Sequence, residues 1–544
     1  MKKIAILVFF TVGFFVHVWA CTGLIAGKQA TVDGSVLVTY SADSHTLYGA
    51  LTSSPAADWP KGSMRSIVEW DTNKPLGEIE QVEHTYAVIG NMNEHQLTVV
   101  ESTWGGRPEL VDTTGIIDYG SLMQLALERA KTAREAIKVM TGLVKKYGYY
   151  SSGESFTIAD PNEAWILDLI GKGPGRRGAV WVAVRIPDDC IAGHANYPRI
   201  HKIPMDDKEN CLYSPDVISF AREMGYFDGL NKDFSFARAY SPADFGALRA
   251  CDARVWSFFR KYDSSMDNYL PYVNGESAEP FPLYVKPSRK LSVQDMKEAM
   301  RDHFEDTPFD MTQDVGAGPF KVPYRFRPMS FEVDGKSYCM ERAIATQQTG
   351  FTLVGQMRNW LPDPVGGVLW FGVDDANTCV YIPMYCGITQ VPECFSPENG
   401  SMYDFSWTSA FWIHNWVAYA RYEPMIGDIR KVQSAVETSL NLRQPAVDKA
   451  AVELYATSPQ EAIAYLTQYS CDAAEASTAR WKKLGEYLMV KFLDGNVKQE
   501  ENGKFKDNGY GLPDSPLFPG YSQEYYEEIV RQTGDRFLET PPKY

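Results

Sequence analysis

The first 21 residues constrain this chain more than any other feature, because they predict where the mature protein begins. Residues 2–16 start with two lysines and continue as a mostly apolar run, and Val18-Trp19-Ala20 fits the small-x-small pattern of a signal cleavage site. Cutting after Ala20 makes Cys21 the first residue, and we expect it to open the first strand of the fold. The sequence therefore predicts a signal peptide over residues 1–20 and a mature protein that is extracytoplasmic, either periplasmic or secreted.

Once it is terminal, Cys21 carries a thiol and a free α-amine on one residue. The amine has a reference pKa of about 7.7–8.0, so near neutral pH it can take the thiol proton, and the thiolate can attack a carbonyl. Two other interpretations stay open. A lipoprotein signal would lipidate Cys21 and block its amine, although Trp19 is bulky where such signals carry a small residue. In the second interpretation Cys21 forms a Cys–His dyad with His45, His194 or His303, and the sequence does not choose among these histidines.

Composition and charge limit the class of partner. The 544 residues include 44% apolar, 13% aromatic and 22% charged residues, which is enough for a large core and gives no sign of disorder. The net charge of −16 argues against a nucleic-acid partner. No stretch after the signal approaches the roughly 20 apolar residues that cross a bilayer. We expect a soluble protein with no membrane contact once the signal is removed, and the association of identical chains stays open.

The nine cysteines give no metal-binding pattern. The chain has no C-x-x-C pair and no paired histidines near a cysteine, so we predict neither a metal site nor an organic cofactor. Eight cysteines remain besides Cys21, an even number that an oxidising compartment could pair, but their spacing assigns no disulfide.

Periodicity and turn residues predict an α+β core followed by a helical region. Residues 21–40 have the pattern of strand, turn, strand around Asp33-Gly34, and residues 119–147 that of one long helix. Ser292 is placed to cap a helix over residues 293–304. After about residue 401 four helices are predicted, with Pro445 and Pro459 in first turns, over residues 428–442, 445–457, 459–468 and 472–493. We expect a core over residues 21–400 and a mainly helical region, residues 401–544, packed on it.

Short motifs in the first 200 residues carry a family resemblance. They are Cys21-Thr22, Gly27-Lys28, Asp33-Gly34-Ser35, Ala42-Asp43-Ser44, Gly90-Asn91-Met92-Asn93-Glu94, the run ESTWGGRPEL at residues 101–110, the run ADPNEAW at residues 159–165, and His194-Ala195-Asn196. Together they resemble the C69 dipeptidase family, whose members are N-terminal nucleophile (Ntn) hydrolases similar to bile salt hydrolase and penicillin V acylase. The resemblance implies an α+β fold with a four-layer αββα sandwich, two stacked antiparallel sheets between helical layers, and helical additions at the C-terminus.

The resemblance also implies roles for three residues. Cys21 matches the nucleophile, and Asp43 matches an acid that holds the amine and thiol of that nucleophile. Such a carboxylate raises the pKa of a nearby α-amine and orients its lone pair. Asn196 stands where related hydrolases keep an asparagine near the nucleophile, suited to bind the amine or a developing oxyanion.

Four further residues are candidates for oxyanion or substrate contacts. Thr103 takes the place of an asparagine where the related amidases have an oxyanion donor, and Glu101 and Asn93 belong to matching motifs. Tyr40 departs from the family pattern, because many members carry an arginine shortly before the aspartate. An arginine would stabilise the thiolate, whereas Tyr40 could donate a hydrogen bond but supplies no charge.

The implied activity is that of an exported cysteine-type dipeptidase, which hydrolyses short peptides through a thioester on Cys21 with the α-amine as general base. In the uncut precursor an amide replaces that base, so the precursor should be inactive. Two alternatives stay open. One is a non-peptide amidase of the bile salt hydrolase or penicillin acylase type, and the other is a non-catalytic surface lipoprotein lipidated at Cys21.

Overall fold

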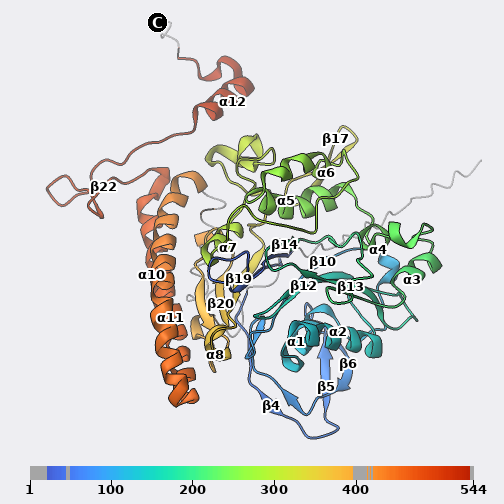
Figure 1. The fold of residues 1–544 in the computed structure, drawn as a ribbon. Coiled ribbons are helices and arrows are strands. Elements are labelled where there is room, and N and C mark those ends of the chain that lie inside the picture. Colours follow the sequence, from blue (N-terminus) through green and yellow to red (C-terminus); the bar gives the residue numbers. More distant parts are fainter. Residues whose placement is uncertain (1–20, 45–48, 396–412, 415–416, 418–420, 540–544) are drawn as a thin grey trace, which may run out of the picture.

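Two antiparallel β-sheets form the centre of the molecule (Figure 1), whose computed structural model describes residues 21–44, 49–395, 413–414, 417 and 421–539. The seven-stranded sheet runs, in spatial order, through β16 (Tyr284–Val285), β14 (Ile191–His194), β1 (Thr22–Ala26), β2 (Val36–Asp43), β19 (Thr349–Met357), β20 (Val368–Val373) and β21 (Ile382–Tyr385). The eight-stranded sheet runs through β15 (Cys211–Tyr213), β13 (Ala179–Ile186), β12 (Ala164–Gly171), β11 (Gly153–Ala159), β10 (Thr98–Trp104), β9 (Met92–Asn93), β8 (Val88–Ile89) and β3 (Ser53–Ser54). β2 contacts β10 and β11, so the two sheets face each other across the main apolar core.

Short ladders and helices surround these sheets. The ladders are β4 (Ala57–Asp58) with β7 (His84–Thr85), β5 (Met64–Val68) with β6 (Pro75–Glu80), β17 (Ser330–Val333) with β18 (Lys336–Cys339), and β22 (Glu500–Glu501) with β23 (Lys504–Phe505). The α-helices are α1 (Tyr119–Arg129), α2 (Ala133–Tyr147), α3 (Val217–Glu223), α4 (Phe236–Tyr240), α5 (Ala253–Arg260), α6 (Leu270–Val273), α7 (Val293–Ala299), α8 (Asp363–Gly366), α10 (Tyr422–Thr457), α11 (Pro459–Lys491) and α12 (Gln523–Thr533). The predicted mixture of antiparallel sheets and helices is confirmed.

The two predicted strands at the start of the core are also confirmed, but their connection spans residues 27–35, and Asp33-Gly34 is a bend within it and not a two-residue hairpin turn. β1 and β2 pair antiparallel, so Cys21, one residue before β1, lies near Asp43, the last residue of β2. Both strands are buried throughout, because they lie in the middle of the sheet between β14 and β19. Gly23 allows β1 to approach β14 closely, since a Cβ at this position would lie 2.8 Å from Nε2 of His194.

α1 and α2 pack on the eight-stranded sheet, on the side away from the other sheet (Figure 1). The prediction of a single helix over residues 119–147 is wrong. Ala130 leaves the helical region with φ −130° and ψ 150°, and Thr132 then caps α2 by accepting a hydrogen bond from the amide of Glu135. A threonine followed three residues later by a glutamate is a helix-start signal, and here it outweighs the continuous apolar periodicity.

On the seven-stranded sheet, α5 packs against β14, and α7 packs against β2 and β19. Ser292 caps α7 as predicted, with a capping box in which Ser292 and Asp295 each accept a hydrogen bond from the other's backbone amide. The helix ends at Ala299, five residues before the predicted end. Both α5 and α7 bring charged side chains into the interior, Arg254 from α5 and Lys297 from α7.

α10 and α11 form a long helical hairpin beside β21 (Figure 1). Pro459 opens α11 as predicted, directly after the N-cap Ser458, but α11 continues unbroken through the two helices predicted there. Pro445 does not open a helix, because α10 runs from residue 422 to residue 457 with this proline inside it. An internal proline costs a helix about 3 kcal/mol. Contacts beyond the proline offset that cost, among them the ion pair of Asp448 with Arg358 of the core at 2.5 Å.

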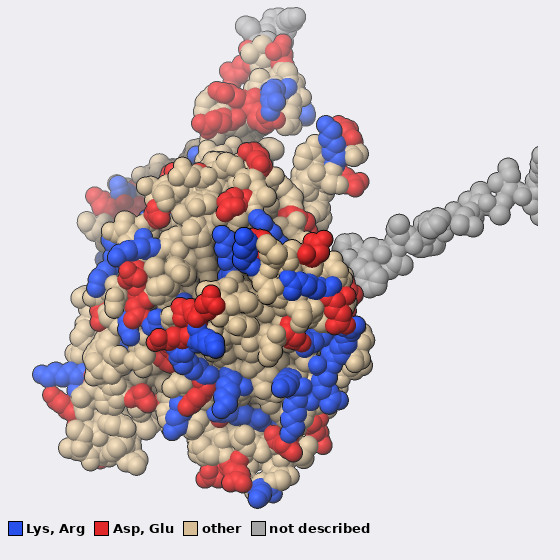
Figure 2. All heavy atoms as spheres, turned by 45° about the vertical axis from the view of Figure 1, so that its right-hand side comes forward, with Lys and Arg blue, Asp and Glu red and all other residues tan. Residues whose placement is uncertain are grey.

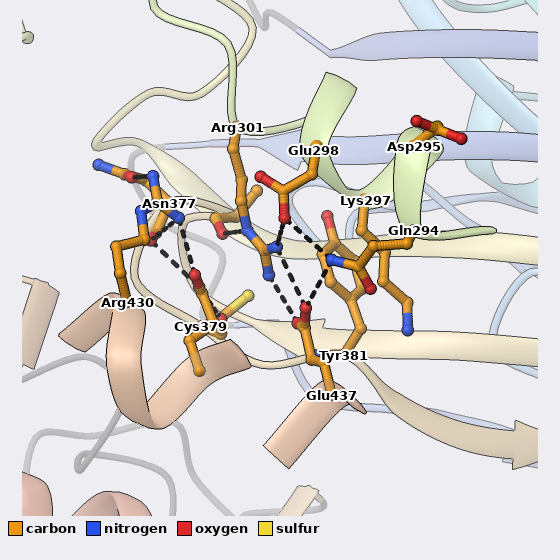
Figure 3. A network of polar contacts seen from close by, with 12 residues as sticks. Gln294, Asp295, Lys297, Glu298, Arg301, Asn377, Cys379, Tyr381, Arg430 and Glu437 are labelled. Carbon is orange, nitrogen blue, oxygen red and sulfur yellow. Dashed lines mark hydrogen bonds and ion pairs between the residues drawn. The ribbon is translucent and has the colours of Figure 1, made fainter. Parts of the chain in front are cut away.

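A buried ion pair joins α10 to the core ahead of Pro445 (Figure 3). Arg301, just after α7, donates to Glu437 at 2.6 Å, and both side chains are almost fully buried. Burial opposes ionisation of Glu437, yet the guanidinium holds its pKa below the usual value. Lys297 lies beside the pair with its ammonium 3.7 Å from the centre of the Trp370 ring, and burial lowers the pKa of Lys297 to about 7. Charge pairs as well as apolar contacts therefore fix the hairpin to the sheet.

The chain beyond α11 extends away from the core and ends its described part just after α12 (Figure 1). In Figure 2 the helix at this end carries mainly acidic side chains, whereas acidic and basic side chains are interspersed over the rest of the visible face. No helix in the described ranges is both long and apolar enough to span a membrane. The expected signal peptide and the expected boundary near residue 400 lie outside the described residues.

Candidate active site

Cys21 lies in the wall of a cavity of about 230 Å³, bounded by strands of both sheets and by α1. The polar lining includes Cys21, Tyr40, Asp43, Asp71, Asn91, Glu101 and Tyr119, and the apolar lining includes Leu51, Trp70, Met123, Leu127, Phe351 and Phe371. This volume is slightly below the roughly 300–1,000 Å³ of sites that hold drug-sized ligands, so it suits a small substrate. Four of the residues predicted from sequence thus meet in one cavity.

Tyr40 connects the thiol of Cys21 to Glu101. The Cys21 sulfur lies 3.6 Å from the Tyr40 hydroxyl, and that hydroxyl donates a short hydrogen bond to Oε1 of Glu101. A phenol has a single proton, so the Tyr40 oxygen is left to accept a hydrogen bond from the thiol. Tyr40 therefore positions the neutral thiol, and its hydrogen bond with the sulfur acts to lower the pKa of Cys21.

The thiol of Cys21 is protonated at rest. Burial raises its pKa well above the usual value, and the negative charges of Glu101 and Asp43 raise it further. An attack by the sulfur consequently requires a base that removes the proton within the cavity.

Glu101 has a second acid behind it. Burial, and then the negative charge of Glu101, raises the pKa of Glu154 well above its usual value, and the two carboxyl groups are hydrogen-bonded. Since neither Oε2 of Glu101 nor Oε1 of Glu154 meets an amine, amide or alcohol donor in the described chain, a proton on Glu154 accounts for that bond. Glu154 is then the donor of this bond and Glu101 the acceptor.

Thr103 contacts this acid pair and not the cavity. Its hydroxyl donates to Oε2 of Glu154 at 3.1 Å, because β10 and β11 place the two residues opposite each other. With its one proton engaged there, the Thr103 hydroxyl is not directed at an oxyanion.

Asp43 is held by a cation that the sequence pattern did not reveal. Its Oδ2 accepts a hydrogen bond from Arg342 at 2.5 Å, and its Oδ1 accepts one from Thr349 at 2.6 Å. Burial raises the pKa of Asp43 to about 6, although Arg342 and Thr349 both act to lower it. Arg342 thus supplies a positive charge beside the site, in a chain that lacks the arginine many family members carry before the aspartate.

Arg254 of α5 connects Asn196 to Cys21. Its buried guanidinium donates to the carbonyl of Cys21 at 3.0 Å and to Oδ1 of Asn196 at 2.7 Å. Asn196 has a φ of 56°, a left-handed conformation that asparagine tolerates better than most residues. Its amide donates to the Thr103 carbonyl at 2.5 Å. Asn196 therefore lies one side chain away from the nucleophile and does not line the cavity.

Asn93 is not brought to the site. Its side-chain amide donates to the carbonyls of Leu127 and Ala130, both at 2.8 Å, and its Oδ1 accepts the amides of His95 and Leu97. These four bonds fix the turn after β9 to the end of α1. Its motif neighbour Asn91 does line the cavity, and its amide makes one hydrogen bond within the described chain, to the Val99 carbonyl.

The described histidines do not pair with the nucleophile. His194 is held by the hydroxyls of Ser102 at 2.6 Å and Thr157 at 2.8 Å, and burial lowers its pKa to about 3. His303 contacts Glu305, and neither of these histidines lines the cavity. His45, the third histidine considered for a Cys–His dyad, lies outside the described residues.

Sequence reasoning missed Arg254, Arg342, Asp71, Tyr119 and Glu154. Arg254 had a usable signal, because it interrupts an otherwise apolar run in α5 and an arginine is seldom buried without a partner. The other four come from loops, from a strand and, for Tyr119, from the first turn of α1, and they have no distinguishing pattern. In the described ranges no group of three or more His, Cys, Asp or Glu side chains is arranged to hold a metal ion. All nine cysteines fall in these ranges and are free thiols.

Comparison with known proteins identifies the family of the chain. Residues 20–435 match the model of peptidase family C69. The chain is 25% identical to a probable dipeptidase of Latilactobacillus sakei, over 84% of this chain and 92% of that protein. It is 27% identical to a probable dipeptidase of Salmonella dublin, over 68% of this chain and 81% of that protein. It is 24% identical to dipeptidase A of Lactobacillus helveticus, over 73% of this chain and 81% of that protein. Since the family match spans well over half of its length, the chain belongs to peptidase family C69 and is a hydrolase that acts on peptide bonds.

Proposed function

We propose that this protein is an exported dipeptidase that begins at Cys21 when mature and uses that residue as an N-terminal nucleophile. The observation that carries the proposal is the position of Cys21, whose thiol lines the cavity while Arg254 anchors its carbonyl at 3.0 Å. The pattern of residues 1–20 supports removal of a signal peptide, and the family match starts at residue 20. The names of the relatives support a dipeptide as substrate.

In this mechanism the α-amine of Cys21 removes the thiol proton, and the thiolate attacks the scissile carbonyl. The protonated amine then donates to the leaving nitrogen, which leaves a thioester on Cys21. Water, deprotonated by the same amine, attacks the thioester and releases the acid. Asp43, held by Arg342, keeps a carboxylate near the amine and raises its basicity.

An amide donor completes the mechanism by stabilising the tetrahedral oxyanion. Asn196 is the donor that the family resemblance implies, but it does not line the cavity and its amide donates to the Thr103 carbonyl. Asn91 is a second candidate, because it lines the cavity and its amide forms only one hydrogen bond within the described chain. The two facing sheets, with α1 and α2 on one and α5 and α7 on the other, support the αββα arrangement of Ntn hydrolases.

The charge of the cavity favours a peptide over the substrates of the related amidases. Asp43, Asp71 and Glu101 line the cavity, and among the lining residues that the structure describes there is no Lys, Arg or His. Bile salts and penicillin V carry an anionic group, which these acids would repel. A dipeptide with a free amine carries the opposite charge at its N-terminus.

Two measurements test the proposal. N-terminal sequencing and intact mass of the exported protein should give an unblocked chain that starts at Cys21, whereas a heavier, blocked N-terminus would establish the lipoprotein alternative. Hydrolysis of Ala-Ala, glycocholate and penicillin V should proceed with Ala-Ala alone. The Cys21→Ala variant should fold and lose turnover, and Cys21→Ser should keep a little, because a hydroxyl is a weaker nucleophile. Full activity of Cys21→Ala would contradict the mechanism.

A further inference from the structure

Two of the three acids in the cavity have no cation beside them among the residues that the structure describes. Asp43 is paired with Arg342, but neither Asp71 nor Glu101 forms an ion pair with any residue of the described chain. Glu101 is 1% exposed, and the hydrogen bonds to its carboxyl group come from the neutral Tyr40 hydroxyl and from protonated Glu154, so no cation of the described chain is bound to it. Buried negative charge without a partner is unfavourable, so a site built this way is completed by a cation from outside.

Asp71 is held rigidly in place. It lies in the turn between β5 and β6, and its Oδ1 accepts a hydrogen bond from the Tyr119 hydroxyl at 2.8 Å. The preceding amide, of Trp70, donates to Asp118 at the N-cap of α1 at 2.8 Å. Gly120 allows this approach, since a Cβ there would lie 2.5 Å from the Trp70 side chain. The turn is thus fastened to α1, which forms one wall of the cavity.

The second oxygen of Asp71 accepts no hydrogen bond from the described chain. Burial, and the nearby charge of Glu101, act to raise the pKa of Asp71 to about 6, so the group remains ionised at neutral pH. Asp71 and Glu101 therefore present two carboxylates to one cavity, each oriented by a tyrosine hydroxyl, Tyr119 for one and Tyr40 for the other.

We propose that Asp71 and Glu101 bind the free α-ammonium group of the substrate's N-terminal residue. The proposal rests on the proposed function, because it takes Cys21 as the nucleophile. In an aminoacyl substrate only the α-carbon separates the ammonium from the carbonyl that is attacked, so the ammonium must lie close to the sulfur. Glu101 meets this condition, since the Tyr40 hydroxyl that it binds lies 3.6 Å from the Cys21 sulfur. The three N–H groups of an ammonium can serve both carboxylates at once.

This arrangement makes the enzyme selective for peptides with an unblocked N-terminus. An N-acetylated peptide has no charge to pair with the two acids, and its acetyl group would have to displace water from them without replacing its hydrogen bonds. A site whose buried polar groups are left unpaired discriminates strongly against such an analogue. The amino-acid side chain then contacts the apolar part of the cavity.

The α-amine of Cys21 is the other cation that Asp71 and Glu101 could bind. Substrate selectivity distinguishes binding of this amine from binding of the substrate ammonium. If Asp71 and Glu101 served the Cys21 amine, removing one acid would lower turnover of free and N-blocked substrates equally. If they bind the substrate, only the free-amine substrate is affected.

The test compares Ala-Ala with N-acetyl-Ala-Ala on the mature enzyme and on Asp71→Asn. Glu69→Gln is the matched control, because Glu69 is an acid of the same turn that does not line the cavity. We expect the wild type and Glu69→Gln to prefer Ala-Ala strongly. In Asp71→Asn, kcat/KM for Ala-Ala should fall about 30-fold, mostly through KM, given that Asp71 is partly exposed. For N-acetyl-Ala-Ala, which the wild type hydrolyses slowly, kcat/KM of Asp71→Asn should stay within about threefold of the wild-type value.

The rate at which iodoacetamide alkylates Cys21 keeps the two proposals separable, and it should be the same in all three proteins. Equal wild-type rates with free and blocked peptides, or a parallel loss for both in Asp71→Asn, would overturn the ammonium site and leave the nucleophile intact. Failure of the wild type to hydrolyse either peptide, with no alkylation of Cys21, would instead overturn the proposed function.

Discussion

Replacing Arg342 by methionine removes the only ionic partner of Asp43 in the described chain while keeping much of the side-chain volume. Asp43 is fully buried, and its pKa is already about 6 with Arg342 present. Without the guanidinium the pKa should rise further, so that Asp43 is neutral at pH 7. We expect Arg342→Met to destabilise the fold and to lower kcat, because a neutral acid no longer supports the α-amine of Cys21.

The size of the pH effect follows from linkage. In the unfolded chain Asp43 is ionised above about pH 4, so its raised pKa stabilises the folded state at low pH and this stabilisation is lost as pH rises through the folded pKa. Between pH 5 and pH 7 the free energy of unfolding of the wild type falls by about 1.4 kcal/mol because of Asp43. The folded group, with its pKa of about 6, stays protonated over only the first of these two pH units, whereas the unfolded group is ionised throughout. In a variant where the pKa of Asp43 lies well above 7, the free energy of unfolding falls by about 2.7 kcal/mol over the same interval.

Urea denaturation at pH 5 and pH 7 measures this difference. Arg342→Met should cost about 1.4 kcal/mol more at pH 7 than at pH 5, on top of a pH-independent loss from its other contacts. Arg176→Met is the control, because Arg176 pairs with Glu223 at the surface, where a salt bridge contributes about 0–1 kcal/mol. An equal cost of Arg342→Met at both pH values would refute the argument that Arg342 keeps Asp43 ionised.

Three further substitutions test separate parts of the structure. Tyr40→Phe removes the hydroxyl between Cys21 and Glu101. For this variant kcat/KM for Ala-Ala should fall about tenfold, with little change in the urea midpoint. An unchanged kcat/KM would show that this contact does not position the thiol. Gly23→Ala puts a Cβ 2.8 Å from His194, and overpacking should cost about 1–3 kcal/mol of unfolding free energy, so a neutral result would contradict the close approach of β1 and β14. Glu437→Gln removes the buried charge partner of Arg301 and leaves only Glu298, whose side chain is more than half exposed. Urea denaturation should show a loss of about 3 kcal/mol, and a loss below 1 kcal/mol would mean that the pair does not hold α10 to the core.

The first hairpin and the helix caps could be predicted from the sequence, because their signals are local. The apolar runs on either side of Asp33-Gly34 give the pairing of β1 and β2, and Ser292 gives the start of α7. The predictions failed where a local signal competed with a longer-range effect. Thr132 interrupts a helix that periodicity alone predicts, and contacts around Pro445 carry α10 through a residue that usually starts or ends a helix.

The residues of the candidate site also fall into two groups, those that the sequence could reveal and those that only tertiary packing brings together. Cys21, Tyr40 and Asp43 are close in sequence, and the pairing of β1 with β2 brings them together. Arg342 reaches Asp43 across 299 residues, and no spacing rule on one sequence could have paired them. Asp71 and Tyr119 meet because a turn is fastened to a helix end, which is likewise a matter of tertiary packing. Asn93 shows the opposite case, a motif residue whose hydrogen bonds are all structural.

The most direct test of the account changes only the residue in front of Cys21. Two forms of the chain are compared, one that starts at Cys21 and one that retains a single methionine before it, and hydrolysis of Ala-Ala is measured for both. The account predicts that the methionine form is at least about 100-fold slower, because an amide nitrogen cannot act as the general base. Equal rates for the two forms would contradict the claim that the α-amine of Cys21 activates its own thiol.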